Sequence, residues 1–205
     1  DMKGNLINNV APPLAPADAA NKAYVDAVVG TNYQKTYWVS TLDGSDANNG
    51  SFTKPFKTIQ KAVDTAPDNQ DAVIYVMHSM TEPDLTISKS KITIVGVSAP
   101  YDGHAVLLYS RVVIQGATTT RVRFKDIHLR TYDLAGGGVP LTINGTQGRH
   151  KFQNTTFYPS AGSDAVDAVG DIGLNGGRWF EFVDCEFMGL VNLGGTPTAT
   201  VGVNV

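Results

Sequence analysis

The sequence is short of several features that would point to a particular chemistry. It has a single cysteine, Cys185, in 205 residues, which excludes an intrachain disulfide framework. No apolar run approaches the ~18 residues that a membrane-spanning helix needs. The formal net charge is only -3 and both signs are mixed along the chain, so charge gives no argument for nucleic acid or an anionic membrane. We therefore expect neither nucleic-acid binding nor membrane insertion.

Motifs for metals and phosphates are also missing. The four histidines do not have the spacing of metal ligands, and we interpret them as structural or surface groups. They are His78, His104, His128 and His150. The glycines at 136–138 lack the following Lys-Ser/Thr of a phosphate loop. Residues 43–50 hold two aspartates and two asparagines that could bind calcium, but they lack the bidentate Glu and the spacing of a known calcium loop. We interpret this loop as a structural turn and expect no cofactor and no metal.

What the sequence has instead is an eight-residue pattern written three times. Its copies are residues 122–129, 150–157 and 180–187 (VRFKDIHL, HKFQNTTF and FEFVDCEF), and residues 92–97 form a degenerate earlier copy. The third residue of each copy, at positions 94, 124, 152 and 182, recurs at a nearly constant step of about 30 residues. The first and third residues, and after a break in phase the sixth and eighth, are mostly apolar. This pattern predicts two short strands joined by a polar corner.

A second marker runs in step with the first. Ile114-Gln115-Gly116, Ile143-Asn144-Gly145 and Leu174-Asn175-Gly176 repeat with the same period of about 30 residues. Self-similarity at a fixed period of ~20–50 residues is typical of a solenoid, and here the repeated units are strands. The predicted fold is therefore all-β: a right-handed, single-stranded parallel β-helix with coils of ~30 residues. The alternative is a β-sandwich in which the alternation is due to chance.

We expect residues 1–34 to form a linker and a short helix. The prolines of residues 11–16 favour extended polyproline geometry. Asp18 is a suitable N-cap for a helix over Ala19–Val29, and Gly30 would end it. A helix of this length is marginal alone, so it needs a neighbour, and other copies of itself are the obvious one. We therefore expect a trimerising helix here.

Residues 35–205 are expected to form the β-helix. A first strand at Tyr37–Ser40 is followed by a helix over 55–66, which would begin with Pro55 and cover the open strand edge of the first coil. Phe56, Ile59, Val63 and Ala66 would form its buried face. The coils begin at Ala72 and continue to Val205. Since the sequence begins without Met and stops inside an alternating strand, we expect it to be a segment of a longer chain.

Two stretches resemble known families. The string Asp-Ala-Ala-Asn-Lys-Ala-Tyr-Val-Asp at 18–26, preceded by Asn-Asn-Val at 8–10, resembles a segment common in the tail fibres of tailed bacteriophages. This resemblance covers about the first thirty residues and implies a trimeric virion fibre. The run from Tyr37 through Asp-Gly-Ser-Asp, Asn-Asn-Gly and Lys-Pro-Phe-Lys-Thr-Ile to Val63 resembles the start of pectate-lyase-like β-helices, which are frequent in phage tailspikes and polysaccharide lyases. It implies a fold and says nothing about chemistry.

The function that the tail-fibre resemblance implies is attachment. The chain would be a structural or receptor-binding segment of a homotrimeric tail fibre or tailspike, located in the virion after assembly in the host cytoplasm. Its partners would be bacterial surface polysaccharide or lipopolysaccharide and other phage tail or baseplate proteins. The alternative is a tailspike that depolymerises polysaccharide as a hydrolase or lyase. A third possibility is a bacterial pectate-lyase-like protein, against which the fibre-like N-terminus argues.

Catalysis by a glycan-cleaving enzyme of this class generally needs two carboxylates, separated by up to ~9.5 Å, with one of them protonated. Glu181 and Glu186 are the candidate pair, since both would point outward from adjoining strands. Lys151 lies one coil before Glu181, so an ordinary exposed ion pair is the competing interpretation, and the one we expect. Asp164 and Asp167, in an expected loop over 160–170, are weaker candidates.

Exposed aromatic rings are the usual means of binding sugars, because a ring face covers apolar sugar carbons at low entropic cost. The glycan-binding candidates are Tyr132, Tyr158 and Trp179, which lie near the expected coil corners. The competing interpretation is that these rings pack beneath their own loops.

The corners themselves carry Asp126, Asn154 and Asp184. If the copies stack in register, these residues form a structural ladder with steps of ~4.8 Å. The amide of Asn154 would then separate two carboxylates and could donate a hydrogen bond to each. Cys185 follows at an inward position, so we expect a buried, inert thiol.

Overall fold

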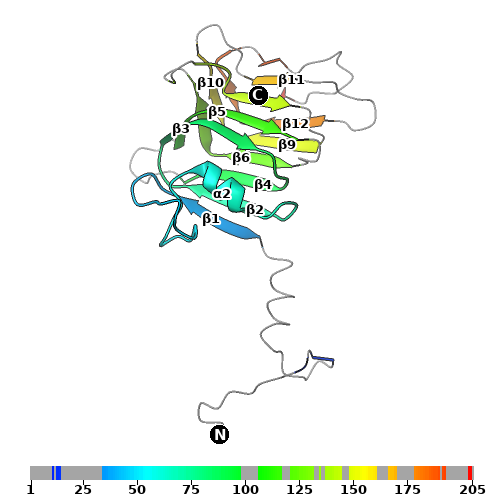
Figure 1. Ribbon diagram of the computed structural model, residues 1–205. Coiled ribbons are helices and arrows are strands. Elements are labelled where there is room, and N and C mark those ends of the chain that lie inside the picture. Colours follow the sequence, from blue (N-terminus) through cyan, green and yellow to red (C-terminus); the bar gives the residue numbers. More distant parts are fainter. Residues whose placement is uncertain are drawn as a thin grey trace. The chain divides into compact units, whose positions relative to one another are not determined.

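The computed structural model describes residues 11, 13–14, 34–97, 106–116, 121–131, 134, 137–144, 148–160, 166–169, 178–189, 191–192 and 203–204. By its internal contacts the chain divides into two units, Asp1–Gln34 and Lys35–Val205. The predicted helix Ala19–Val29 and most of the linker before it lie outside the described residues. The fold below is that of the second unit (Figure 1).

The second unit is built mostly from strands, and the described part of it contains one α-helix, α2 (Ile59–Thr65). The strands are β1 (Lys35–Val39), β2 (Ala72–Val76), β3 (Met80–Ile87), β4 (Ile92–Gly96), β5 (Val106–Gln115), β6 (Val122–Lys125), β7 (Ile127–Arg130), β8 (Leu141–Asn144), β9 (Gly148–Gln153), β10 (Thr156–Tyr158), β11 (Val166–Val169), β12 (Arg178–Val183), β13 (Glu186–Phe187), β14 (Val191–Asn192) and β15 (Val203–Asn204). Strands such as β4 and β5 alternate buried with half-buried residues, as a strand with one face on a core must. The predicted all-β class is confirmed.

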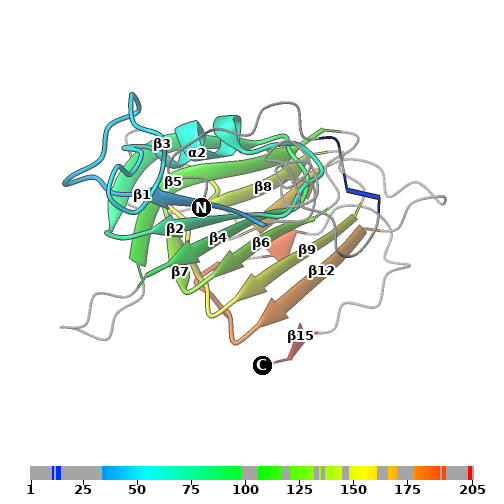
Figure 2. The same cartoon turned by 90° about the horizontal axis from the view of Figure 1, so that it is seen from below.

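The strands form two parallel sheets. One has seven strands in the order β1-β2-β4-β6-β9-β12-β15, and the other has eight in the order β13-β10-β7-β5-β8-β11-β14, with β3 also paired to β5. Parallel neighbours cannot be joined by a tight hairpin, so each connection must cross over. Here the chain crosses between the sheets: β4 and β6 are neighbours in the first sheet, and the intervening β5 lies in the second. Figure 2 shows β2, β4, β6, β9 and β12 side by side in this order.

The long strand β5 occupies two strand positions of the eight-stranded sheet. Its first half pairs with β7 and its second half with β8. The later strands keep to these two tracks, because β10 and β13 follow β7 while β11 and β14 follow β8. Segments far apart in sequence are thereby aligned in three parallel rows, one in the seven-stranded sheet and two in the eight-stranded sheet.

The predicted register of the eight-residue repeat is confirmed. Ile94, Phe124, Phe152 and Phe182 are successive Cα partners on β4, β6, β9 and β12. All four side chains are buried. The ring centroids of Phe124 and Phe152 are 5.7 Å apart, and those of Phe152 and Phe182 are 5.2 Å apart. A repeat in the sequence has become a continuous column of stacked apolar side chains, which we call the phenylalanine column.

The glycine-containing marker is right for its first two copies and wrong for its third. Ile114 pairs with Ile143, as predicted. The partner of Ile143 on the next strand is Ala168 of β11, and not Leu174. The error arose because the short segment Val-Asp-Ala-Val at 166–169 fits a strand as well as a loop. Asp167 is therefore opposite Thr142 within the sheet, whereas Asp164 and residues 174–176 lie outside the described residues.

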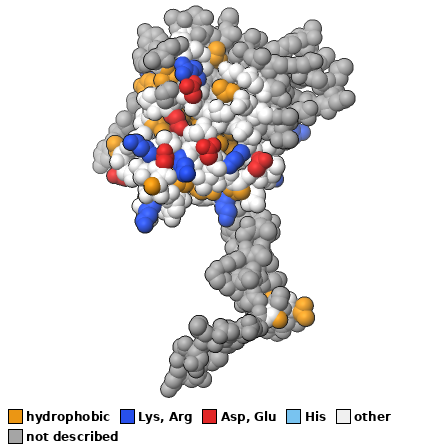
Figure 3. Space-filling model, viewed as in Figure 1, with side chains coloured by type: hydrophobic (Ala, Val, Ile, Leu, Met, Phe, Trp, Pro, Cys, Tyr) orange, Lys and Arg blue, Asp and Glu red, His pale blue; other side chains and the backbone are white. Residues whose placement is uncertain are grey.

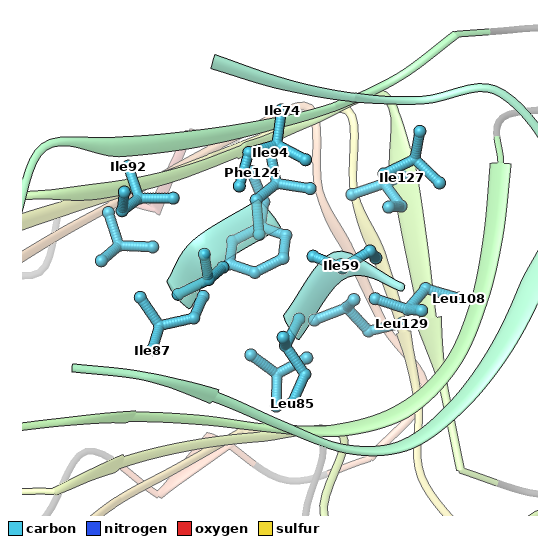
Figure 4. Close-up of a cluster of buried hydrophobic side chains, with 14 of the residues drawn as sticks. Ile59, Ile74, Leu85, Ile87, Ile92, Ile94, Leu108, Phe124, Ile127 and Leu129 are labelled. Carbon is cyan, nitrogen blue, oxygen red and sulfur yellow. The ribbon is translucent and has the colours of Figure 1, made fainter. Parts of the chain in front are cut away.

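The core is formed by the inward residues of both sheets together with buried residues of α2. Figure 4 shows Ile59 of α2 among side chains from the two sheets. The labelled side chains are Ile59, Ile74, Leu85, Ile87, Ile92, Ile94, Leu108, Phe124, Ile127 and Leu129, each of which is at most 1% exposed. The predicted inward positions of the repeat are among them. Burial of these side chains is the main stabilising contribution to the unit.

The helix near the start of the unit is shorter than predicted. Instead of spanning 55–66, it begins at Ile59, and Thr58 is its N-cap. Phe56, expected on the helix, is extended: its N–H donates to the carbonyl of Trp38 at 2.9 Å, and its carbonyl accepts from the N–H of Ser40 at 2.9 Å. These bonds use backbone groups at the edge of β1, so Phe56 is fixed before the first helical turn begins. Pro55 is therefore not the first helical residue.

Two charged side chains, which the sequence did not draw attention to, hold the ends of α2. Glu82 of β3 is buried and accepts from the N–H groups of Ile59 and Gln60, both at 2.8 Å. Burial raises the pKa of the Glu82 carboxyl, and these two backbone hydrogen bonds oppose part of the rise. At the other end, Lys89 Nζ donates to the carbonyls of Asp64 and Ala66 at 2.5 and 2.6 Å. Otherwise unpaired backbone groups of a short helix are satisfied in this way.

The corner ladder is present in part. Asp126, Asn154 and Asp184 have φ values of 54°, 48° and 50°, a left-handed conformation that Asp and Asn tolerate better than most residues. The amide nitrogen of Asn154 donates to Asp126 Oδ1 at 2.9 Å. Among the described contacts of these three residues, the second bond that we expected, to Asp184, does not occur. The corner residues thus set the turn through their backbone conformation, and one side-chain hydrogen bond links two layers.

Candidate functional site

The outward face of the seven-stranded sheet carries charged residues at one position on three neighbouring strands. Arg123, Lys151 and Glu181 are successive Cα partners on β6, β9 and β12, so we call them the charged column. Lys151 Nζ lies 2.8 Å from Glu181 Oε1, which confirms the predicted ion pair. Both side chains are partly exposed, so the pair contributes little to stability. Figure 3 shows charged side chains of both signs interspersed on the face that it presents.

The proposed carboxylate pair is divided between the two sheets. Glu181 belongs to β12 of the seven-stranded sheet, and Glu186 begins β13 of the eight-stranded sheet, after the corner at 184–185. Glu186 is exposed and opposite Thr156 in the register. Glu181 is engaged in the ion pair with Lys151, and the two carboxyl groups lie on different sheets. Cys185, between them, is half-buried rather than fully buried, and burial raises the pKa of its thiol.

The eight-stranded sheet carries a different kind of column on its outward face. Tyr109, Arg130 and Tyr158 are successive Cα partners on β5, β7 and β10, and all three are half-buried. The Cζ atom of Arg130 lies 5.5 Å from the ring centroid of Tyr109 and 5.9 Å from that of Tyr158. A guanidinium group between two phenol rings gains cation–π attraction from both. We call these three residues the tyrosine–arginine column.

Its neighbours reinforce the column. His128, two residues before Arg130, lies edge-on to the Tyr158 ring, with centroids 6.4 Å apart. His128 Nδ1 accepts from the N–H of Thr156 at 3.1 Å, which leaves the proton of a neutral imidazole on Nε2. The Tyr158 ring is thereby contacted by two side chains of the neighbouring strand β7. Its ring has a defined position, as a binding surface requires.

An ion pair lies close along β5. Arg111, two residues after Tyr109 on the same strand, has its Nε 2.7 Å from Asp84 Oδ1. The hydrogen bond from Arg111 lowers the pKa of the Asp84 carboxyl. Arg111 Nη1 also donates to the carbonyl of Gly137 at 3.2 Å. The guanidinium group of Arg111 is therefore used in fixing the chain between β7 and β8.

A second aromatic group lies at the β1 edge of the seven-stranded sheet. Trp38 of β1 stacks on Tyr75 of β2, with ring centroids 4.6 Å apart, and Phe52 packs edge-on against Trp38 at 4.9 Å. Phe52 is 60% exposed. This trio was not predicted from the sequence, although the alternation of Tyr37-Trp38-Val39 places Trp38 on the face opposite the buried Val39. Trp38 and Tyr75 are half-buried, so Phe52 is the most accessible ring of the trio.

Of the three predicted glycan-binding aromatics, Tyr158 lies in a surface column. Tyr132 lies outside the described residues, and Trp179 is placed only through its backbone, in β12 opposite Arg149. Arg130 and Tyr109 were missed because neither belongs to a corner. The signal that could have found them is the repeat itself, which aligns Arg130 with Tyr158 one coil later.

The loop at 43–50 uses its side chains to hold its own structure. Asp46 Oδ1 accepts from the N–H groups of Lys57 and Thr58, at 2.9 and 3.0 Å. Asn48 Nδ2 donates to the carbonyl of Pro55 at 2.9 Å. The interpretation as a structural turn is confirmed by these bonds. Within the described ranges, no three His, Cys, Asp or Glu side chains gather as a metal site would require, and no helix is long and apolar enough to cross a membrane.

Comparison with known proteins adds little to this geometry. The sequence matches no protein-family model and no curated protein. A solved structure of a rhamnogalacturonan lyase is similar over 74% of this chain, with 14% sequence identity and a TM-score of 0.35. The match spans about half of that structure, 51% of its chain. Similarity at this level supports no functional argument.

Proposed function

We propose that this chain is a segment of a homotrimeric phage tail fibre or tailspike that attaches the virion to polysaccharide on the bacterial surface. The observation that carries the proposal is the tyrosine–arginine column: Tyr109, Arg130 and Tyr158 aligned on consecutive strands of an outward face. Aromatic rings with an adjacent fixed donor group suit the flat, hydroxyl-rich surface of a sugar chain. The tail-fibre-like string at 18–26 supports placement in a fibre.

We further propose that the two sheets belong to a right-handed, single-stranded parallel β-helix with coils of ~30 residues. The support is the constant register of the repeat, in which partners on adjacent strands always come from consecutive copies. On this proposal residues 1–34 precede the β-helix as linker and trimerising helix, and α2 covers its first coil. The outer surface of such a β-helix presents successive strands to a long, repetitive ligand.

Binding is preferred over depolymerisation because the candidate acids are not arranged for catalysis. Glu181 is in an ion pair with Lys151, and Glu186 lies on the other sheet.

The proposal is tested by incubating the protein with capsular polysaccharide and lipopolysaccharide purified from a panel of bacterial strains. Co-sedimentation without a change in polysaccharide size supports attachment. Shortened polysaccharide would favour the depolymerase instead, especially if Glu181→Gln or Glu186→Gln abolished the shortening. Binding to no member of the panel would contradict attachment.

The oligomeric state is tested separately by multi-angle light scattering. A mass of three times 21.8 kDa is expected for the homotrimer. A monomer at micromolar concentration would contradict the proposed homotrimer but would not test whether the protein binds polysaccharide.

A further inference from the structure

We propose that the side chain of Gln60 takes the place of a neighbouring strand: it closes the free edge of β3 and prevents that edge from pairing with a second copy of this chain. This inference concerns association between copies and is independent of the proposed attachment to polysaccharide. It arises from one arrangement, in which the amide group of a helical residue forms two hydrogen bonds with the backbone of a single residue of an edge strand.

The strand β3 lies at an edge of the eight-stranded sheet. Among the described strands it pairs only with β5, so one side of its backbone has no strand partner. An edge strand of eight residues presents N–H and C=O groups that can template pairing with another chain. The element that packs against β3 on this side is the short helix α2.

The amide group of Gln60 makes the contacts that a strand would make. The N–H of Thr86 donates to Gln60 Oε1 at 2.8 Å, and Gln60 Nε2 donates to the carbonyl of Thr86 at 3.1 Å. Both backbone groups of one residue are thus bonded to one partner, as in a hydrogen-bonded residue pair of an antiparallel sheet. Gln60 Nε2 also donates to Asp64 Oδ1 at 2.9 Å, so the orientation of the amide is fixed by three hydrogen bonds.

The helix and the strand hold each other reciprocally. The backbone N–H of Gln60 donates to Glu82 Oε1 at 2.8 Å, so a strand side chain binds the helix backbone. The side chain of Gln60 in turn binds the strand backbone at Thr86. Because the position of Gln60 is set by Glu82, its side chain loses little additional freedom when it closes the edge.

The edge of β1, the first strand of the seven-stranded sheet, is closed in a different way. The N–H of Trp38 donates to the carbonyl of Gly50 at 2.8 Å, and the carbonyl of Trp38 accepts from the N–H of Phe56 at 2.9 Å. These are bonds between backbone groups, which the loss of a side chain does not remove. The cover over Thr86, by contrast, depends on one side chain and can be removed by one substitution.

A second copy of this chain is the partner that fits the uncovered edge. Without the amide of Gln60, Thr86 presents one donor and one acceptor side by side. Thr86 of another copy, related by a twofold rotation, presents the same two groups in the complementary order. Two such edges can therefore pair in antiparallel orientation as an isologous contact, in which each copy replaces the amide that the other has lost.

Three variants test this role. Gln60→Ala removes the amide, and since alanine has the highest helix propensity, α2 keeps its intrinsic preference. Gln70→Ala is the matched control, because it makes the same substitution at an exposed residue of the turn before β2. Adding Thr86→Pro to Gln60→Ala blocks the edge, because the N–H that proline lacks is the one that points away from β5.

Circular dichroism and thermal unfolding establish that each variant folds. If Gln60→Ala does not fold, Gln60→Asn takes its place, because its amide is one methylene group too short to reach Thr86. If the double variant does not fold, Gln60→Lys takes its place, because a charged side chain on an edge opposes pairing.

The measurements are hydrogen exchange at the Thr86 amide in dilute protein and sedimentation equilibrium over a series of concentrations. Gln60→Ala should speed exchange at Thr86 by about threefold to tenfold, since its hydrogen bond to the amide is lost. As the concentration rises, its mass should increase to twice that of wild type under the same conditions, and exchange at Thr86 should slow again. Gln70→Ala should match wild type in both measurements, and the double variant should keep the wild-type mass.

Three outcomes would contradict the proposal. Faster exchange at Thr86 without an increase in mass would overturn the pairing with a second copy. The same increase in mass with and without Thr86→Pro would place the contact elsewhere and would overturn it too. Unchanged exchange at Thr86 would show that Gln60 does not cover this edge. Each measurement is made without polysaccharide, so failure here leaves the proposed attachment untouched.

Discussion

The phenylalanine column and the charged column lie on the same three strands, at adjacent positions, yet they follow different rules. Phe124, Phe152 and Phe182 repeat one residue type and stack inside the core. The residue before each of them differs in every layer: Arg123, Lys151 and Glu181. Inward positions are limited by the volume that neighbouring layers leave, whereas outward positions accept residues of either charge, as Arg123, Lys151 and Glu181 show. The recurring inward residue type therefore indicates the fold, whereas the varying outward residues determine the chemical character of the surface.

The largest effect should come from breaking the inward column. Phe152 is fully buried and stacks on Phe124 and Phe182 while Phe157 contacts it edge-on. Phe152→Ala removes these contacts and leaves a cavity, so we expect a loss of about 3–5 kcal/mol in the free energy of unfolding. Urea denaturation followed by circular dichroism measures it. A loss below about 1 kcal/mol would show that the layers repack freely.

The next effect concerns a buried charge that the repeat does not contain. Glu82→Ala leaves the N–H groups of Ile59 and Gln60 without their acceptor, at a cost of about 1–3 kcal/mol. Glu82→Gln should cost less, because one amide oxygen can still accept. Thermal unfolding of both variants should preserve this order. If both variants unfolded at the same temperature as wild type, the stability of α2 would not depend on this carboxylate.

The pH dependence of Glu82 has a definite sign. Its pKa is raised in the folded state by burial, with Asp46 and Asp64 adding smaller contributions in the same direction. The ionised form is therefore disfavoured by folding, and stability from this group rises as the pH falls from neutral through the raised pKa. Wild type should gain stability relative to Glu82→Gln over that range. A relative loss on acidification would mean that the two hydrogen bonds dominate instead.

A smaller effect is expected at the corner ladder. Asn154→Asp replaces the amide that donates to Asp126 Oδ1 with a third carboxylate in the row. We expect a loss of up to ~1 kcal/mol in the free energy of unfolding at pH 7, measured by urea denaturation, because like charges on adjacent strands repel each other. Asn144→Asp is the control and should be milder, since its partners Gln115 and Val169 carry no charge. Equal losses for both variants would remove charge repulsion as the cause.

The smallest effect belongs to the charged column itself. Lys151→Met and Glu181→Gln, alone and together, form a double-mutant cycle for the ion pair at 2.8 Å. Because both side chains are partly exposed, the coupling energy should lie between 0 and about 1 kcal/mol and decrease in high salt. A coupling well above this range would place the outward column among the determinants of stability and weaken the comparison.

The sequence predicted well where one residue type recurs. Positions 94, 124, 152 and 182 were in the correct register because apolar inward residues and αL-tolerant corners leave few alternatives. It failed at the start of α2, where tertiary hydrogen bonds to Trp38 and Ser40 hold Phe56 extended against a local preference for helix. It also failed at β11, where a short segment with little periodicity forms a strand only because a partner strand is present.

The candidate site was harder to predict than the fold. Tyr158 was selected for its residue type and corner position, but its significance depends on Arg130 and Tyr109, one and two layers away. A cation between rings becomes visible only after the register of both halves of β5 is known. Glu82 could not be found at all, because a lone glutamate in a strand gives no sign that it caps a helix.

Stacked partners are separated by a nearly constant number of residues, and this spacing affects how the layers form during folding. The pairing of Phe124 with Phe152, and of Phe152 with Phe182, closes loops of nearly equal length. The entropy of closing a loop depends on its length only logarithmically, so each new layer meets nearly the same barrier as the one before. Layers should therefore be added one after another on an existing strand edge, and the packing of α2, held by Glu82 and Lys89, against β1, β2 and β3 provides a folded start for this process. Variants that loosen α2 should then slow refolding, whereas variants in the last strands should mainly speed unfolding.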